Sequence, residues 1–287
     1  MPGNNRLAIW GDGAVGTGLA VALSPFGRVL LVGPPGSGRG RITFESLGAF
    51  PGSAEVEKVE CGDLIAAELC LIAVKAYDLA EVSGPAARCT DGACICVSNG
   101  MGLERAWGDS WKSRVEPAIL TAGFGPGPEP GRSVMTTFGD VIVSADGSAG
   151  GLFGKSPIPV RFTDSMEMLR WGKWLVNSVI NPLGAISGLP NDRLLGAGLE
   201  DAIEILFEEL LPVVPDEYRS SAGSEALSMM TRLLGSSSNR CSMLQDIDAG
   251  RRTEIDFMTG MCIEFSGGRC PASACVTGLL KALSKVV

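Results

Sequence analysis

The sequence contains no histidine among its 287 residues. This absence excludes a Ser-His-Asp triad and a histidine-ligated metal site, because both need an imidazole. Any proton transfer must therefore use a lysine, an acid, a cysteine, a tyrosine or water.

Basic side chains are too few for a general nucleic-acid binder. Lys and Arg together number 24 against 32 Asp and Glu, so the formal net charge is −8. Binding to nucleic acid without regard to sequence needs an excess of basic residues, and those present form no long cluster. We expect no nucleic-acid partner.

Long apolar runs and zinc-type cysteine pairs are also missing. The longest apolar runs, such as residues 69–74 and 94–97, are far too short to cross a bilayer. The first residues lack a basic segment followed by a long apolar one. Nine cysteines are scattered along the chain without a CxxC pair. We expect a cytoplasmic protein with reduced thiols, no metal and no membrane partner.

The first half of the chain alternates short apolar runs with longer segments. Strands are expected at residues 6–11, 28–33, 68–74, 93–98 and 117–123. The intervening segments are long enough for crossover helices, so the rhythm predicts a parallel sheet with helices on its faces. Residues 130–162, rich in β-branched residues and turns, predict further strands that extend this sheet.

The second half has long helical patterns that begin near Thr163 or Asp164. Polar breaks are expected at residues 188–192, 213–224, 235–240, 248–252 and 266–273. The fold class predicted is an α/β Rossmann-type domain over residues 1–163, followed by an all-helical domain over residues 164–287.

The segment GDGAVG follows the first expected strand and opens an apolar helix. Gly11 would permit a tight turn, Gly13 the close approach of a pyrophosphate, and Gly16 the packing of helix on strand. Ala14 and Val15 complete this loop. The context predicts a dinucleotide site, with a purely structural turn as the alternative.

An acid that selects NAD is missing after the second expected strand. Between Gly33 and Glu45 no Asp or Glu occurs, although such an acid normally lies about twenty residues beyond the glycine loop. Ser37, Arg39 and Arg41 are available instead, and a guanidinium holds a phosphate well. The loop therefore predicts NADP(H), unless these arginines only solvate a loop.

Residues 173–186 read KWLVNSVINPLGAI, in which Lys173, Asn177 and Asn181 recur every fourth position. On a helix these three side chains would line about 12 Å of one face. The apolar residues between them leave little solvated surface, although a solvated face is the alternative. Pro182 frees a backbone carbonyl and predicts a local kink.

Two further polar residues follow expected strands of the sheet. Lys75 comes after residues 68–74, and Asn99 comes after residues 93–98. Ligands of such sheets bind just past the carboxyl ends of the strands, although either residue could be an ordinary loop residue.

Together with the glycine loop, the patterns KxxxNxxxNP at 173–182 and SMLQDxxxxRxTEID at 242–256 make the chain similar to the ketopantoate reductase family. The resemblance runs from the first strand to about Gly260. It implies NADPH-dependent reduction of 2-dehydropantoate to pantoate, in a cleft between a Rossmann domain and a helical domain. A homodimer is the candidate assembly.

The resemblance also implies roles for individual residues. Lys173 is the implied general acid and Glu254 the implied essential acid. Implied contacts of the substrate are Asn99, Asn177, Asn181, Asn239 and Ser242, and implied contacts of the cofactor are Lys75 and Asn99 beside the glycine loop and Arg39. Burial would lower the pKa of Lys173 and Glu254 would raise it, so the net direction stays open. A turn is expected near Gly250, because a continuous helix would hold Ser242 and Glu254 about 18 Å apart.

Other functions remain open from the sequence. Relatives with the same polar set reduce other 2-keto acids, so a branched or hydroxylated 2-keto acid is the first alternative. A non-catalytic NADP(H)-binding regulator is the second, and we expect such a regulator to lose the lysine or the glutamate. A structural protein would leave the matched polar set unexplained.

Overall fold

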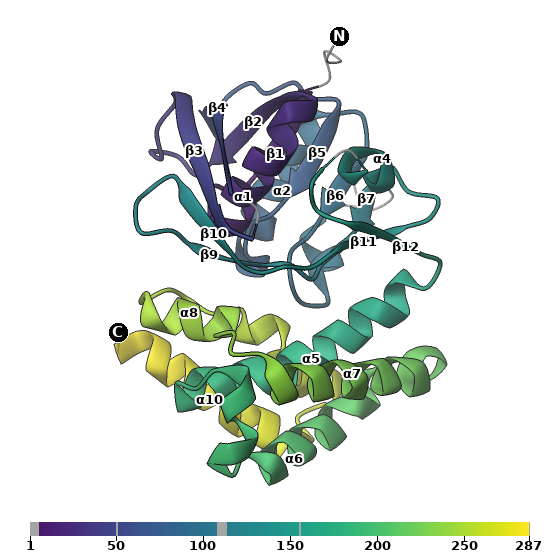
Figure 1. Cartoon of the computed structure of the whole chain (residues 1–287). Helices are drawn as coiled ribbons and strands as arrows, with labels where there is room; N and C mark the ends of the chain where they lie inside the picture. The colour runs from purple at the N-terminus through teal and green to yellow at the C-terminus, as the bar shows by residue number, and fades with distance from the viewer. Residues whose placement is uncertain (1–5, 50, 108–113, 155, 287) are drawn as a thin grey trace. The chain divides into compact units, whose positions relative to one another are not determined.

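The structure is a computed structural model that describes residues 6–49, 51–107, 114–154 and 156–286. The chain divides into two compact units (Figure 1). The first consists of Met1–Ser98 and Leu103–Met166, and the second of Asn99–Gly102 and Glu167–Val287. The short segment Asn99–Gly102 therefore belongs with residues that follow it by more than sixty positions in sequence.

Among the described residues, the larger sheet of the first unit has nine strands, in the order β7-β6-β5-β1-β2-β4-β3-β10-β9. Its strands are β1 (Arg6–Trp10), β2 (Arg28–Gly33), β3 (Gly40–Gly48), β4 (Gly52–Glu60), β5 (Leu69–Ile72), β6 (Cys94–Cys96), β7 (Val115–Pro117), β9 (Gly123–Pro126) and β10 (Arg132–Thr137). The central pairs β1 with β2, β1 with β5 and β5 with β6 are parallel. The predicted fold class of this half is confirmed.

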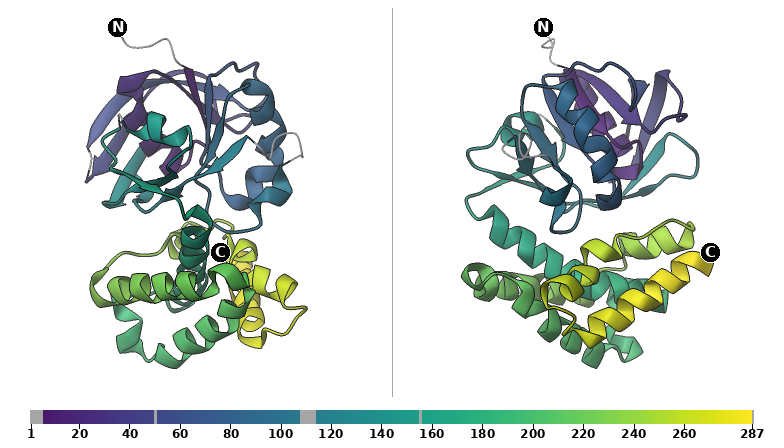
Figure 2. Two further views of the ribbon diagram at one scale, coloured as in Figure 1. Left: turned by 90° about the vertical axis from the view of Figure 1, so that its right-hand side faces the viewer. Right: turned by 180° about the vertical axis from the view of Figure 1, so that it is seen from behind.

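Two helices cover opposite faces of this sheet (Figures 1 and 2). Helix α1 (Ala14–Leu23) joins β1 to β2, and helix α2 (Leu79–Cys89) joins β5 to β6. The two connections run in opposite directions along the sheet, and right-handed crossovers then place their helices on opposite faces. Strand β1 is buried at four of its five residues, which explains its uninterrupted apolar sequence. Short 3₁₀ helices lie at η1 (Ser24–Phe26), η2 (Ala76–Asp78) and η3 (Leu103–Ala106).

A hairpin replaces the crossover helix expected between the second and third predicted strands. Strands β3 and β4 pair antiparallel, and β4 pairs parallel with β2, so that Gly33 lies opposite Glu60. Buried and less buried residues alternate around Phe44 in β3, as in a strand with one covered face. The expectation of a helix was wrong because it considered only the length of this segment and ignored the alternation.

The strands expected late in the first half divide between two sheets. Strand β10 extends the large sheet, whereas β11 (Val141–Ser144) and β12 (Val160–Thr163) join β8 (Ile119–Leu120) in a separate three-stranded sheet. The strand expected at 117–123 is interrupted at Ala118, between β7 and β8. Helix α4 (Ala149–Phe153) connects β11 to β12.

The second unit is helical, as predicted. Its helices are α5 (Met166–Ser187), α6 (Glu200–Leu210), α7 (Asp216–Ser236), α8 (Ser242–Asp248), α9 (Thr259–Phe265) and α10 (Pro271–Val286). Its 3₁₀ helices are η4 (Asn191–Arg193), η5 (Leu195–Ala197), η6 (Leu211–Val213) and η7 (Ile255–Phe257). Helix α5 is buried on nearly all sides, with Leu175, Val179 and Ile180 in the core.

The polar break expected at residues 213–224 is wrong over most of its length. Helix α7 begins at Asp216, directly after Pro215, and its first turn carries Asp216 and Glu217. Acids favour a helix N-terminus, and the small residue Ala222 is fully buried in the core. Tertiary packing therefore overrides the weak helix propensity of the serines and glycine in this segment.

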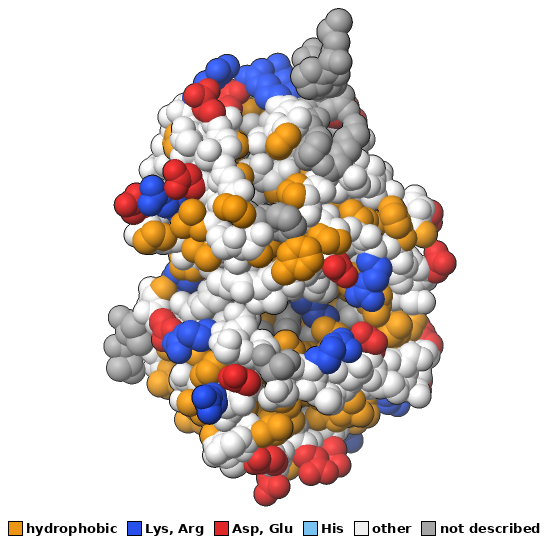
Figure 3. Space-filling view, in the orientation of Figure 1, with side chains coloured by type: hydrophobic (Ala, Val, Ile, Leu, Met, Phe, Trp, Pro, Cys, Tyr) orange, Lys and Arg blue, Asp and Glu red, His pale blue; other side chains and the backbone are white. Residues whose placement is uncertain are grey.

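Three features of the structure relate to the composition: the distribution of charged side chains, the cysteines and the lengths of the apolar helices. On the face drawn in Figure 3, Lys and Arg side chains lie beside Asp and Glu side chains and form no continuous basic surface. All nine cysteines lie within the described residues and are free thiols. Across the described ranges, no helix has the length and apolar character that a bilayer crossing requires.

Candidate functional site

The glycine loop between β1 and α1 is shaped by close backbone contacts. Gly11 has a φ of +111°, and a Cβ atom there would lie 2.8 Å from the carbonyl oxygen of Ala73. A Cβ at Gly16 would lie 1.7 Å from the carbonyl oxygen of Gly11. Both positions therefore require glycine.

The N-terminus of α1 can accept a phosphate group. Gly13 precedes the helix, no side chain caps its N-terminus, and its first turn contains no acid. A Cβ at Gly13 would meet nothing within 4 Å, so the approach to the backbone is open there. Ala14 and Val15 pack against the core of the sheet and hold the helix in place. These features fit the pyrophosphate of a dinucleotide.

Lys75 lies beside this loop in the fold. It follows β5 and precedes η2, and its carbonyl oxygen accepts a hydrogen bond from the amide of Asp78. The carbonyl oxygen of Ala73, two residues earlier, is the atom that crowds Gly11. The structure thus places Lys75 two residues beyond a contact with the glycine loop.

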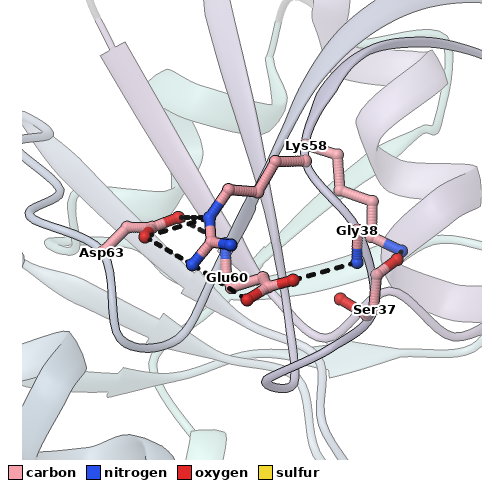
Figure 4. Close-up of polar contacts among 6 residues, drawn as sticks. Ser37, Gly38, Lys58, Glu60 and Asp63 are labelled. Carbon is pink, nitrogen blue, oxygen red and sulfur yellow. Dashed lines mark hydrogen bonds and ion pairs between the residues drawn. The ribbon is translucent and has the colours of Figure 1, made fainter.

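Arg39 is held by two carboxylates. Its guanidinium donates to Asp63 at 2.9 Å and lies 2.9 Å from Glu60, whose other oxygen accepts from the amide of Gly38 at 3.0 Å (Figure 4). The hydrogen bond from Arg39 lowers the pKa of Asp63. Arg41 instead points from β3 to Glu55 on β4. Cofactor binding by Arg39 stays a prediction.

Glu60 is an acid beside the end of the second strand that the sequence pattern did not indicate. It follows Gly33 by 27 residues in sequence but lies opposite it in the sheet. The sequence signal that could have revealed the hairpin is the alternation of apolar and polar residues at 42–44 and 54–56, which is typical of strands with one covered face.

The polar stripe lies on α5 as predicted from its spacing. Lys173 and Asn177 are partly buried, and Asn181 is buried. Trp174, between them, is also buried, and its indole nitrogen donates to the carbonyl oxygen of Phe257 at 3.2 Å. A solvated helix face does not fit this burial.

Lys173 and Asn99 are brought together within the second unit. The ammonium of Lys173 donates to Oδ1 of Asn99 at 3.0 Å. The next residue, Gly100, has a φ of +101°, and a Cβ there would lie 2.9 Å from the Cβ of Phe257. Glycine at this position therefore allows the Asn99 segment to approach η7 closely.

The electrostatics of Lys173 answer the question left open by the sequence. Burial lowers its pKa to about 8, and the nearby carboxylate of Glu254 opposes part of this effect. Glu254 is itself buried and directly precedes η7. An amine with this pKa can both donate and regain a proton near neutral pH.

The start of α8 is attached to α5 beside the stripe. The thiol of Cys241, which directly precedes Ser242, lies 3.4 Å from the carbonyl oxygen of Asn181. The carbonyl oxygen of Asn239 accepts a hydrogen bond from Asn191 in η4. The structure thus places Ser242 one residue from a contact with the stripe, and it connects Asn239 to η4.

The expected turn between Ser242 and Glu254 is confirmed. Helix α8 ends at Asp248, and Gly250 has a φ of +63°. Arg251 then donates to the carboxylate of Asp246 at 3.0 Å, which fixes the reversed chain. Within the described ranges, no group of three acidic, cysteine or histidine side chains is arranged to hold a metal ion.

The helical unit matches one family model, described as the ketopantoate reductase PanE/ApbA C-terminal region, over residues 165–284. Curated relatives are 2-dehydropantoate 2-reductases. That of Pyrococcus horikoshii is 33% identical over 40% of this chain and 38% of the relative. That of Salmonella typhimurium is 38% identical over 37% of this chain and 34% of the relative. These alignments thus span little more than a third of each relative.

Longer alignments and solved structures extend the similarity. The 2-dehydropantoate 2-reductase of Vibrio cholerae is 28% identical over 77% of this chain and 79% of the relative. A ketopantoate reductase from Ralstonia eutropha has a TM-score of 0.77 and 22% identity, covering 98% of both chains. D-mandelate dehydrogenase with NADH and anilino(oxo)acetate has a TM-score of 0.82 and 19% identity, covering 98% of this chain and 99% of that one. At such identities the solved structures support the fold.

Proposed function

We propose that the chain is a member of the ketopantoate reductase family and that it reduces 2-dehydropantoate to pantoate with NADPH, since its helical unit matches the model of that family's C-terminal region and its fold matches a solved member. The observation that carries the proposal is the partly buried ammonium of Lys173, held by Asn99 and shifted to a pKa of about 8. A glycine loop shaped for a dinucleotide supports it from the first unit.

The reaction consumes one keto acid, one NADPH and one proton, and it forms one hydroxy acid and one NADP⁺. The glycine loop between β1 and α1 would hold NADPH, which when bound would supply the hydride for the keto carbon. Lys173 donates a hydrogen bond to the keto oxygen and then transfers a proton to it, so that no free alkoxide accumulates. The neutral amine then regains a proton from water.

Asn99 and Glu254 set the state of this acid. The Asn99 oxygen accepts a hydrogen bond from Lys173 and so orients the ammonium. The Glu254 carboxylate favours the protonated form against the effect of burial. Glu254 would thus keep a useful fraction of Lys173 charged at neutral pH.

The remaining polar residues of the site would bind the keto acid substrate. Asn177 and Asn181 present amides along α5, and Ser242 begins α8 beside them. Amides and hydroxyls can donate to the substrate carboxylate and its hydroxyl group without adding charge to the site. Asn239, in the loop directly before α8, is the remaining candidate contact.

A second candidate is reduction of a different 2-keto acid. The structural similarity to D-mandelate dehydrogenase is the observation that favours it, because mandelate is a 2-hydroxy acid with an aromatic side chain. The same lysine chemistry would serve both substrates, since only the group beyond the keto carbon differs.

A substrate panel tests the proposed function. NADPH consumption is followed with three substrates: ketopantoate, a branched 2-keto acid that lacks the hydroxyl group, and the 2-keto acid whose reduction gives mandelate. Each assay is repeated with NADH. We expect the highest kcat/KM for ketopantoate with NADPH. A higher kcat/KM for another keto acid would assign that acid as the substrate in place of ketopantoate. No turnover of any keto acid in the panel would contradict the proposed activity.

We further propose a homodimer that acts in the cytoplasm. A dimeric ketopantoate reductase from Staphylococcus aureus shares the fold, with a TM-score of 0.78 and 18% identity. Light scattering of the purified chain tests the assembly, and a monomer at all concentrations would contradict it.

A further inference from the structure

The carboxyl end of β2 is covered by side chains from two other segments. A Cβ atom at Gly33 would lie 2.6 Å from a carboxylate oxygen of Asp12 and 2.2 Å from the hydroxyl of Ser37. Asp12 belongs to the glycine loop, and Ser37 to the loop between β2 and β3. Glycine at position 33 is therefore what leaves room for both groups.

Lys58 joins these two segments. Its ammonium lies 2.7 Å from the Asp12 carboxylate and donates to the carbonyl oxygen of Ser37 at 2.8 Å. The Lys58 and Asp12 side chains are only 12% and 24% exposed. Lys58 reaches this position because β4, which carries it, pairs directly with β2.

Asp12 lies where dinucleotide-binding sheets often carry an acid that binds the cofactor. In dinucleotide-binding sheets an acid at the end of the second strand accepts a hydrogen bond from the adenosine ribose. Here the sequence lacks that acid, but Asp12 brings a carboxylate to the same end of β2 from the glycine loop. Lys58 then supplies a cation beside it.

The Ser37 hydroxyl is a second sign that this corner receives a polar group. Its oxygen is buried and has no hydrogen-bond partner among the described residues. Burying a hydroxyl without a partner costs free energy, and a ligand oxygen could remove that cost. Arg39, in contrast, already has Glu60 and Asp63 as partners.

We propose that Lys58 and Ser37 bind the 2′-phosphate of NADP(H). The Asp12 carboxylate repels that phosphate, and Lys58 neutralises this repulsion. Arg39 then serves to fix the loop after β2 through Glu60 and Asp63. The inference rests on the proposed function, because it assumes that the first unit binds a nicotinamide dinucleotide. It adds Lys58 and Asp12, which the sequence pattern did not indicate, to Ser37, which it did.

Calorimetric titration of the purified chain with 2′,5′-ADP and with 5′-AMP tests the proposal, because the two probes differ in the 2′-phosphate. Lys58→Met should weaken binding of 2′,5′-ADP by about tenfold or more and leave that of 5′-AMP nearly unchanged, since a charge-assisted hydrogen bond is lost. Asp12→Asn should strengthen binding of 2′,5′-ADP. Ser37→Ala should weaken it by a smaller factor.

Arg28→Met is the matched control, because it also removes an ion-paired cation, the partner of Glu57, but at the amino end of β2. It should leave the ratio of the two affinities unchanged. Arg39→Met is the competing variant, and a tenfold loss of 2′,5′-ADP binding in it, with none in Lys58→Met, would overturn the proposal. Weaker 2′,5′-ADP binding by Asp12→Asn would also overturn it.

Two further results separate the possible failures. If Lys58→Met does not fold because Asp12 loses its partner, the double variant Asp12→Asn, Lys58→Met removes both charges and must still lose the preference for 2′,5′-ADP. A wild-type chain that binds neither probe contradicts the proposed function itself. Binding of 2′,5′-ADP that Lys58→Met and the double variant leave unchanged overturns only this inference.

Discussion

At the scale of single residues, the proposed mechanism depends on the charge state of Lys173. Its burial within α5 lowers the pKa to about 8, and Glu254 opposes part of the shift. The lysine must be protonated to act as an acid, so its active fraction falls as the pH rises through about 8. In the proposed mechanism, Asn99 and Glu254 would therefore control the rate of proton transfer as well as the orientation of the ammonium.

A pH profile tests this assignment. The kcat/KM for keto acid reduction should fall with rising pH, with an apparent pKa of about 8. In Glu254→Gln the carboxylate that raises the pKa is gone, so the fall should move to lower pH. A profile that is flat up to pH 10, or a shift to higher pH in Glu254→Gln, would contradict the role of Lys173.

Removal of the ammonium gives a second test. Lys173→Ala should reduce turnover by at least the roughly 10²-fold typical of a general acid and leave the dissociation constant of NADPH nearly unchanged. Lys281→Ala is a control, because Lys281 on α10 is half-exposed and pairs with Asp256. Steady-state kinetics and calorimetry measure the two effects, and normal turnover in Lys173→Ala would refute the assignment.

At the scale of elements, Gly13 and Gly16 of the glycine loop have different surroundings. Gly16 is crowded by the carbonyl of Gly11, whereas Gly13 faces open space. Gly16 is thus required for the packing of α1 on β1, whereas we propose that Gly13 serves the approach of the ligand.

Two alanine variants test this separation. Gly16→Ala should lower the free energy of unfolding by about 1–3 kcal/mol or prevent folding, because the new methyl group overlaps a backbone oxygen. Gly13→Ala should leave the thermal midpoint nearly unchanged and weaken NADPH binding, because its φ of −74° suits alanine. Thermal unfolding and calorimetry distinguish them, and equal losses of stability would contradict the account.

The same scale shows which elements the sequence predicts well. Continuous apolar runs located β1 and β2, because strands buried on both faces need such runs. The hairpin of β3 and β4 was missed, because one of its faces is only partly covered and its sequence is mostly polar. Helix α7 was missed at its start, because buried contacts of Ala222 outweigh local propensity.

At the scale of the whole chain, sequence order and spatial grouping differ. Asn99 follows a strand of the first unit but belongs to the second, where it contacts Lys173. The resemblance to a family selected these residues, yet only the structure shows their hydrogen bond and the direction of the pKa shift. The partners of Arg39 and the Asp12–Lys58 pair were not predictable, because they depend on how a hairpin pairs with β2.

The central claim is that the chain transfers a hydride from NADPH to the keto carbon of 2-dehydropantoate. The most direct measurement uses NADPH that carries deuterium at C4 on either face, followed by mass spectrometry of the product. We predict pantoate with one added deuterium from one of the two labelled cofactors, and almost none with Lys173→Ala. Absence of labelled pantoate with both cofactors, in a chain that binds NADPH, would contradict the account.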